Sequence, residues 1–182
     1  MGAMPRARDE LSTGEWAVLV MLSEGRAHGF ALARAMAPGG EVGQVWAMRR
    51  PLVYRALEML EQRDLIRPAG TVPSQTGPQR TILEVTPTGR RTVSEWLRQP
   101  VDHVRDARSL LMLKLLFLSR RGADPTPLLD AQRAQFSSHA ESLSAALEQT
   151  DGFDRTLLLW RLENTTAALR FTETLLAERT RG

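Results

Sequence analysis

One helix and the hairpin after it constrain the fold of this chain more than any other feature. Residues 49–66 read RRPLVYRALEMLEQRDLI, and residues 79–91 read QRTILEVTPTGRR. Pro51 suits the first turn of a helix, where a backbone N–H would have no acceptor within the helix. Two arginines and a tyrosine lead that helix and a basic β-ribbon follows it, which suits the major groove of DNA and its flanking phosphates. The pattern favours nucleic-acid binding over catalysis.

Capping and turn residues predict the other elements of the N-terminal half. Ser12 and Glu15 form a capping box, which predicts a helix that ends near Gly25. Prolines in and beside the two strands indicate a protruding edge ribbon, not a central sheet. The remaining expected elements are a helix from His28 to Pro38–Gly40, a helix over Pro51–Arg63, strands over Leu65–Val72 and Gln79–Thr86 joined by a tip at 73–78, and a helix capped by Thr88 that runs through Leu97.

This order of elements, three helices, a two-stranded hairpin and a further helix, is that of a winged helix-turn-helix domain. Four apolar residues share one face of the third helix and are expected to pack on the first two: Val53, Ala56, Leu57 and Leu60. Arg50, Tyr54 and Arg55 then project from its N-terminal half. The acidic Glu58, Glu61 and Asp64 lie further along, so the charge of this helix is polarised.

The C-terminal half is predicted to be helical throughout. Helices are expected over Asp106–Arg120, from Asp124 to about Gln149, and from Asp151 or Asp154 to about Arg179. Turn residues and a drop in net charge coincide near 98–106. The fold class is therefore mainly α: a winged helix-turn-helix domain with a two-stranded wing over 10–100, and an α-helical dimerisation and effector domain over 101–182.

Charge placement agrees with that division. The chain has 24 basic residues, of which only Lys114 is a lysine, and a formal charge of +3. Residues 49–98 hold nine basic and five acidic side chains, so the excess lies where the motif is. Arginine suits bidentate contacts with phosphates and base edges. Replacement of lysine by arginine in a GC-rich genome explains the same composition and stays an open alternative.

Several function classes lack the residues they need. Without cysteine there is no disulfide, thiolate metal site or cysteine nucleophile. The three histidines, His28, His103 and His139, have no carboxylates at ligand spacing, so no metal or other cofactor is expected. No nucleophile triad or phosphate-binding glycine loop is present, so an enzyme is not expected. Neither a signal peptide nor a membrane-spanning run is visible, which favours a cytoplasmic, nucleoid-associated protein.

Four segments resemble the PadR family of bacterial transcriptional regulators. They read HGFAL, VYRALEMLEQRDLI, QRTILEVTPTGRR and VRDARSLLMLKLLFL, in the family's order. The resemblance implies a dimeric winged-helix repressor with C-terminal helices at the dimer interface, and often release of DNA on binding a small molecule. Tyr54 matches the family's recognition-helix tyrosine, and Thr86 with Gly89 matches its T-x-x-G motif. Asp64 departs from a common glycine, but tolerates a left-handed backbone.

The predicted DNA-binding surface combines the start of the third helix with the wing. Each member also has a plainer interpretation as an exposed surface residue. The candidates are Arg49, Arg50, Pro51, Tyr54, Arg55, Gln79 and Arg80.

The last helix indicates self-association. Leu158, Leu162, Thr165, Leu169, Thr172 and Leu176 follow a heptad spacing. A second stripe widens the apolar face and contains Leu157, Trp160, Ala168, Phe171 and Leu175. We expect a homodimer interface at Leu158, Leu162, Leu169 and Leu176, although a helix buried within one chain gives a similar pattern. A pocket for a small apolar or aromatic effector is expected to be lined by Phe117, Trp160 and Phe171.

Two functions fit this sequence. The first is a homodimeric repressor that binds a pseudo-palindromic operator in double-stranded DNA and is released by a small-molecule effector. The alternative is a winged-helix module for protein–protein contact without sequence-specific DNA binding.

Overall fold

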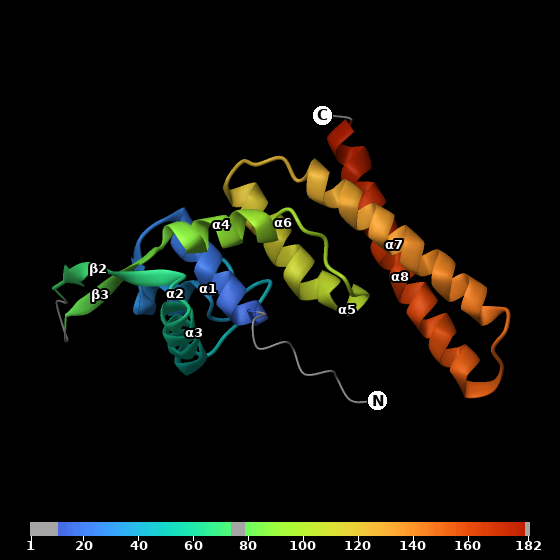
Figure 1. Cartoon of the computed structure of the whole chain (residues 1–182), viewed down its shortest axis with the longest axis horizontal. Coiled ribbons are helices and arrows are strands. Elements are labelled where there is room, and N and C mark those ends of the chain that lie inside the picture. Colours follow the sequence, from blue (N-terminus) through green and yellow to red (C-terminus); the bar gives the residue numbers. More distant parts are fainter. Residues whose placement is uncertain (1–10, 74–78, 181–182) are drawn as a thin grey trace. The chain divides into compact units, whose positions relative to one another are not determined.

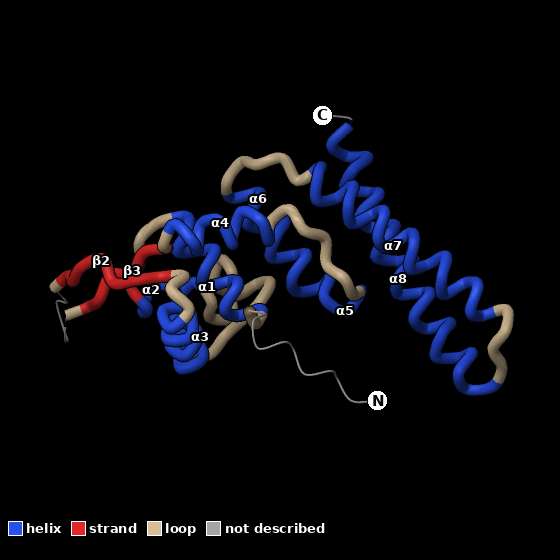
Figure 2. The backbone as a smooth tube through the Cα atoms, viewed as in Figure 1, coloured by secondary structure: helices blue, strands red, loops and turns tan. Residues whose placement is uncertain are grey.

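The computed structural model describes residues 11–73 and 79–180, which form mostly helices and three short strands (Figures 1 and 2). The chain divides into two compact units, Met1–Trp96 and Leu97–Gly182. The expected domains at 10–100 and 101–182 stay a prediction about which parts fold independently. The expected hairpin tip at 73–78 lies, apart from Pro73, outside the described residues.

The first unit is a winged helix-turn-helix domain. Its elements are α1 (Thr13–Glu24), β1 (Ala27–His28), α2 (Gly29–Ala35), α3 (Arg50–Gln62), β2 (Ile66–Val72), β3 (Arg80–Val85) and α4 (Pro87–Trp96). The capping box at α1 is confirmed, because the Ser12 hydroxyl accepts from the Glu15 amide at 3.3 Å and the Glu15 carboxylate accepts from the Ser12 amide at 2.6 Å. These two bonds satisfy N–H groups that have no acceptor within the helix.

The core of this unit is built around α1. Five of its residues are almost completely buried: Ala17, Val18, Leu19, Val20 and Leu22. The predicted inner face of α3 is also buried, and α3 packs on α1 and α2 as expected. Trp16 of α1 stacks on Trp96 of α4 with ring centroids 4.6 Å apart, so the two helices pack through these rings.

The sheet corrects the expected two-stranded ribbon. The expected β2–β3 ribbon is present, but the order is β1-β3-β2, so a third strand makes β3 the central strand of the sheet. The added strand is only two residues long, with Ala27 opposite Leu83 and His28 opposite Ile82. So short a strand shows no alternating pattern in a sequence. The register of β2 shifts at Pro68–Gly70, at the opposite edge of the sheet.

The junction of α3, β2 and α4 depends on Thr86, which corrects the expected cap at Thr88. The Thr86 hydroxyl accepts from the Gly89 amide at 3.1 Å and donates to the Asp64 carbonyl at 2.7 Å. Thr88 lies inside α4. Asp64 has φ of 54°, so the expected left-handed conformation is confirmed. A Cβ on Gly89 would lie 2.2 Å from the Leu65 carbonyl oxygen, which explains the T-x-x-G spacing.

All regular elements of the second unit are helical in the described residues. Its elements are α5 (Val104–Asp106), the π-helical turn η1 (Ala107–Leu111), α6 (Met112–Arg120), α7 (Thr126–Leu147) and α8 (Gly152–Thr180). The expected single helix over Asp106–Arg120 is thus interrupted by a wider turn. Helices α7 and α8 run side by side in opposite directions (Figure 1).

Buried polar groups in this unit have partners. The side chain of Gln132, fully buried, accepts from the Val101 amide and donates to the Val101 carbonyl, at 2.7 and 3.0 Å. Lys114 is 2% exposed and donates to the carbonyl of Gln99. Both contacts tie the segment before α5 to the helices.

Within residues 11–73 and 79–180, no helix is long and apolar enough to cross a membrane. The same residues contain no group of three or more His, Cys, Asp or Glu arranged to hold a metal ion.

Candidate nucleic-acid interface

A groove of about 650 Å³ lies between α3, the start of α2 and the wing. Four predicted DNA-binding residues line it: Arg50, Tyr54, Gln79 and Arg80. The first two come from the recognition helix and the other two from the wing, 25 or more residues later in the chain. The fold therefore brings the two halves of the predicted surface together.

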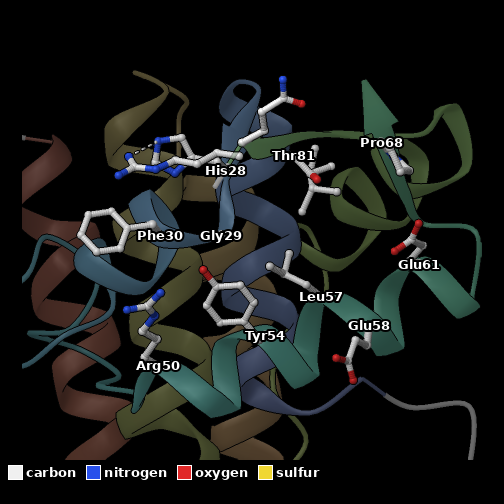
Figure 3. Close-up of a pocket in the computed structure, with 13 residues that line it drawn as sticks. His28, Gly29, Phe30, Arg50, Tyr54, Leu57, Glu58, Glu61, Pro68 and Thr81 are labelled. Carbon is white, nitrogen blue, oxygen red and sulfur yellow. Dashed lines mark hydrogen bonds between the residues drawn. The ribbon is translucent and has the colours of Figure 1, made fainter. Parts of the chain in front are cut away.

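Phe30 connects the two halves of this basic surface. The Arg50 guanidinium lies 5.4 Å from the Phe30 ring centroid, and the Arg80 guanidinium lies 5.0 Å from it. Arg50 also lies 5.6 Å from the ring of Tyr54. Phe30 is 41% exposed, so its ring holds two like charges near each other at the surface. Figure 3 shows Phe30, Arg50 and Tyr54 on the same side of the groove.

Tyr54 reaches this position because residue 29 is glycine. A Cβ there would lie 2.9 Å from the Tyr54 ring and 3.3 Å from Leu57. The ring packs against the start of α2 in the space that a side chain would occupy. Tyr54 remains 38% exposed, which leaves part of the side chain accessible from solvent.

Charge in the groove is polarised along α3. Arg50 stands at the start of the helix, whereas Glu58 and Glu61 line the groove two and three turns later (Figure 3). A polyanion that enters from the N-terminal end of α3 meets the cations and avoids the carboxylates. This distribution agrees with the polarity expected from the sequence.

Two other arginines of the unit form ion pairs with a glutamate of the sheet. Glu84 of β3 accepts from Arg67 of β2 and from Arg26 before β1, each through two nitrogens at 2.7–2.8 Å. The Arg67 hydrogen bond, helped by Arg26, holds the pKa of Glu84 below its ordinary value of 4.5, against a smaller opposing effect of burial. Glu84 thereby links β3 to β2 and to the residue that precedes β1.

Sequence comparison shows what the first unit is similar to. Residues 18–95 match the model of the Transcriptional regulator PadR-like family. The match lies within the winged helix-turn-helix unit, which is therefore similar to the PadR-like family. A probable transcriptional regulator of Mycobacterium tuberculosis, Rv1176c, is 28% identical over 92 residues, which are 50% of this chain and 47% of that protein. The match thus spans about half the length of that relative.

Two solved structures of PadR-like proteins align with most of this chain, both with TM-scores below 0.5. Bacillus subtilis PadR in complex with operator DNA is 23% identical, with a TM-score of 0.43 over 90% of this chain and 97% of that one. The PadR-like transcriptional regulator BC1756 from Bacillus cereus is 15% identical, with a TM-score of 0.42 over 94% and 98%. The family match covers three of the four segments noted in the sequence, and the fourth, VRDARSLLMLKLLFL, lies beyond it.

The other predicted DNA-binding residues of the PadR-like unit lie outside the groove. Arg49 is the N-terminal capping position of α3, and Pro51 occupies its first turn, both exposed. Arg55 lines a separate hollow beside Trp46 and Met48. The predicted DNA-binding residues of α3 are therefore distributed over two of its faces.

His28 and Phe30 are groove residues that were not among the predicted DNA-binding positions. His28 begins α2 as expected, because its Nδ1 accepts from the Ala31 amide at 3.0 Å. The HGFAL segment was visible in the sequence, but its proximity to the wing was not. Strand β1, which pairs His28 with Ile82, creates that proximity.

In the second unit, Trp160 lines a hollow of about 870 Å³ together with residues of the α5–η1 segment and α7, including Arg105, Arg108 and His139. Phe117 is completely buried and is not among the residues that line it. Phe171 is 40% exposed and also lies outside the hollow. The structure does not bring the three predicted effector-pocket residues together.

The heptad seam of α8 includes the helix's two buried residues. Thr165 and Thr172 are 2% and 0% exposed, and the seam leucines Leu158, Leu162, Leu169 and Leu176 are half-buried. Since α8 packs mainly on α7, this seam faces α7 of the same chain. Several large apolar side chains of α8 remain exposed: Phe153, Leu157, Leu159, Trp160 and Phe171.

Proposed function

We propose that this protein is a DNA-binding transcriptional regulator that acts as a homodimeric repressor. One observation carries the proposal: Arg50 and Tyr54 of the recognition helix meet Gln79 and Arg80 of the wing in a single groove. The four side chains offer charge and hydrogen-bond donors at the end of α3 that is free of carboxylates. Arg49 and Pro51 begin the same helix, and Arg55 lies on its adjacent face.

In this proposal the N-terminal end of α3 enters the major groove and the wing contacts the flanking backbone. Two copies of α3 in a dimer, about 34–36 Å apart, would read a pseudo-palindromic operator. A dimer bound to this operator would block transcription of nearby genes. This role places the protein on chromosomal DNA in the cytoplasm.

The proposed dimer surface is α8. Its predicted members Leu158, Leu162, Leu169 and Leu176 are half-buried against α7, and the exposed apolar side chains continue the apolar face around the helix. Phe153 is 78% exposed and Trp160 is 67% exposed, which is unfavourable for large apolar side chains in water. A second copy of α8 would cover them.

A small apolar or aromatic effector is proposed to bind the hollow beside Trp160. A stacking surface with hydrogen-bonding groups around it is typical of small-molecule sites. Quenching of Trp160 fluorescence by an added compound, in a variant with Trp16, Trp46 and Trp96 changed to Phe, tests this site. A compound that releases DNA without changing that fluorescence would place the effector elsewhere.

The function is tested by fluorescence anisotropy with the DNA upstream of the protein's own coding sequence. A scrambled duplex is measured beside it across a salt series. Nanomolar affinity for the native duplex alone, with a salt slope of several units, supports a sequence-specific regulator. Changing Arg50 and Tyr54 to Ala should abolish this binding and leave the dimer intact. Equal, weak affinity for both duplexes would favour a protein-interaction module instead.

A further inference from the structure

The imidazole of His28 has a defined tautomer. Its Nδ1 accepts the Ala31 amide hydrogen at 3.0 Å, so this nitrogen carries no proton. A neutral imidazole has one donor and one acceptor nitrogen. The proton therefore resides on Nε2, which is a donor.

The Nε2–H of His28 faces another donor. The Nη1 atom of Arg80 lies 3.5 Å away, and a guanidinium has no acceptor. These two groups cannot hydrogen-bond each other. Both can reach one shared oxygen, because N–H···O bonds of 2.7–3.2 Å allow an acceptor to bridge donors at this separation.

The surroundings favour an anion at that point. Phe30 holds the Arg50 and Arg80 guanidiniums on the same side of the groove, 5.4 and 5.0 Å from its ring. Within residues 11–73 and 79–180, neither arginine has an ion-pair partner. The carboxylates of the groove, Glu58 and Glu61, lie further along α3.

We propose that His28 Nε2 and Arg80 Nη1 bind one oxygen of a DNA backbone phosphate. Phe30 is a positioning residue that keeps Arg80 beside His28 while Arg50 extends toward the bases. The inference rests on the proposed DNA-binding function and assigns a phosphate contact to the start of α2. The first helix of the helix-turn-helix would thus share its backbone contact with the wing.

Substitution His28→Asn separates this role from helix capping. Asparagine is a favourable N-cap residue and can still accept from the Ala31 amide, but it is too short to place a donor beside Arg80. Thermal melting followed by circular dichroism verifies that the variant is folded. The partner variant is Arg80→Gln, and the control is Arg91→Gln, which removes an exposed arginine from α4.

Affinity is measured for the upstream duplex and the scrambled duplex across a salt series. His28→Asn should weaken both complexes by roughly tenfold, since a phosphate contact carries no sequence information. Its salt slope should not change, because neutral imidazole releases no counterion. Arg80→Gln should lower the slope by about one unit. The double variant should be little weaker than Arg80→Gln alone, because both donors share one acceptor. Arg91→Gln should change neither quantity.

Three results would overturn the inference. The first is that His28→Asn binds both duplexes as tightly as the wild-type protein does, in an assay where the wild-type protein binds DNA. The second is that the losses of affinity caused by His28→Asn and Arg80→Gln add fully in the double variant. The third is equally tight binding of inorganic phosphate at His28, measured by its imidazole NMR signals, which would make this a free-phosphate site. Absence of DNA binding by the wild-type protein would instead refute the proposed function itself.

Discussion

The burial of Lys114 predicts an unusual rise of stability at alkaline pH. This side chain is 2% exposed, and burial lowers its pKa from 10.5 to about 8, against an opposing attraction from Asp102. Below pH 8 the folded protein must hold the charged form in a poorly solvated place. Between pH 8 and 10.5 the folded state releases this proton while the unfolded state still binds it. The unfolded state then holds more protons, so the free energy of unfolding increases with pH.

The two pKa values determine the size of this effect. Each pH unit between them is worth about 1.4 kcal/mol, so the full rise is about 3 kcal/mol. Lys114 is the only lysine and the chain has no cysteine, which leaves few other groups that titrate in this range. Most of the alkaline change in stability is therefore assigned to one residue.

Urea unfolding followed by far-UV circular dichroism at a series of pH values measures this rise. The matched variant is Lys114→Met, which keeps an unbranched side chain and removes the titrating group. The wild-type protein should gain stability above pH 8 and the variant should not. An equal rise in the variant, or a wild-type stability that falls through this window, would refute the argument from burial.

Three further predictions concern the sheet, the wing junction and the dimer. The pKa of Glu84 is lowered in the folded state, so its contribution to stability is present above pH 4.5 and is lost as pH falls through the lower folded-state value. The acid unfolding of Glu84→Gln should therefore depend less on pH than that of the wild-type protein. An unchanged profile would contradict this. Gly89→Ala should destabilise the fold by about 1–3 kcal/mol in urea unfolding, because the added Cβ meets the Leu65 carbonyl. The control Gly25→Ala should change the free energy of unfolding little, because nothing lies within 4 Å of its Cβ. Equal effects of the two substitutions would argue against crowding. Trp160→Asp should convert the proposed dimer to a monomer in analytical ultracentrifugation, and a dimer of unchanged strength would remove Trp160 from the interface.

Local features of the fold could be predicted from the sequence. The capping box of Ser12 and Glu15 joins residues three apart, so its signal is complete within one turn of chain. The inner face of α3 follows from helical periodicity. The left-handed Asp64 and the T-x-x-G motif were recognised through the family resemblance. The last three helices were predicted from their turn residues and apolar spacing.

The candidate site was only partly predictable. Arg50 and Tyr54 could be chosen because they stand at the start of one helix. Arg55 could not be separated from them, because the sequence does not show which side of α3 the wing covers. The seam of α8 could not be assigned to a second subunit or to α7, since both leave the same heptad pattern.

The sequence by itself determined where most helices lie, which residues of α3 face inward, and where the basic residues concentrate, because these properties depend on residues within a few positions of each other. The tertiary structure decided which distant groups meet. His28 and Arg80 are 52 residues apart, and Arg26 and Glu84 are 58 apart. Their contacts exist because a two-residue strand pairs with β3, the central strand of the sheet. Such a contact depends on the packing of the whole unit, and no local pattern records it.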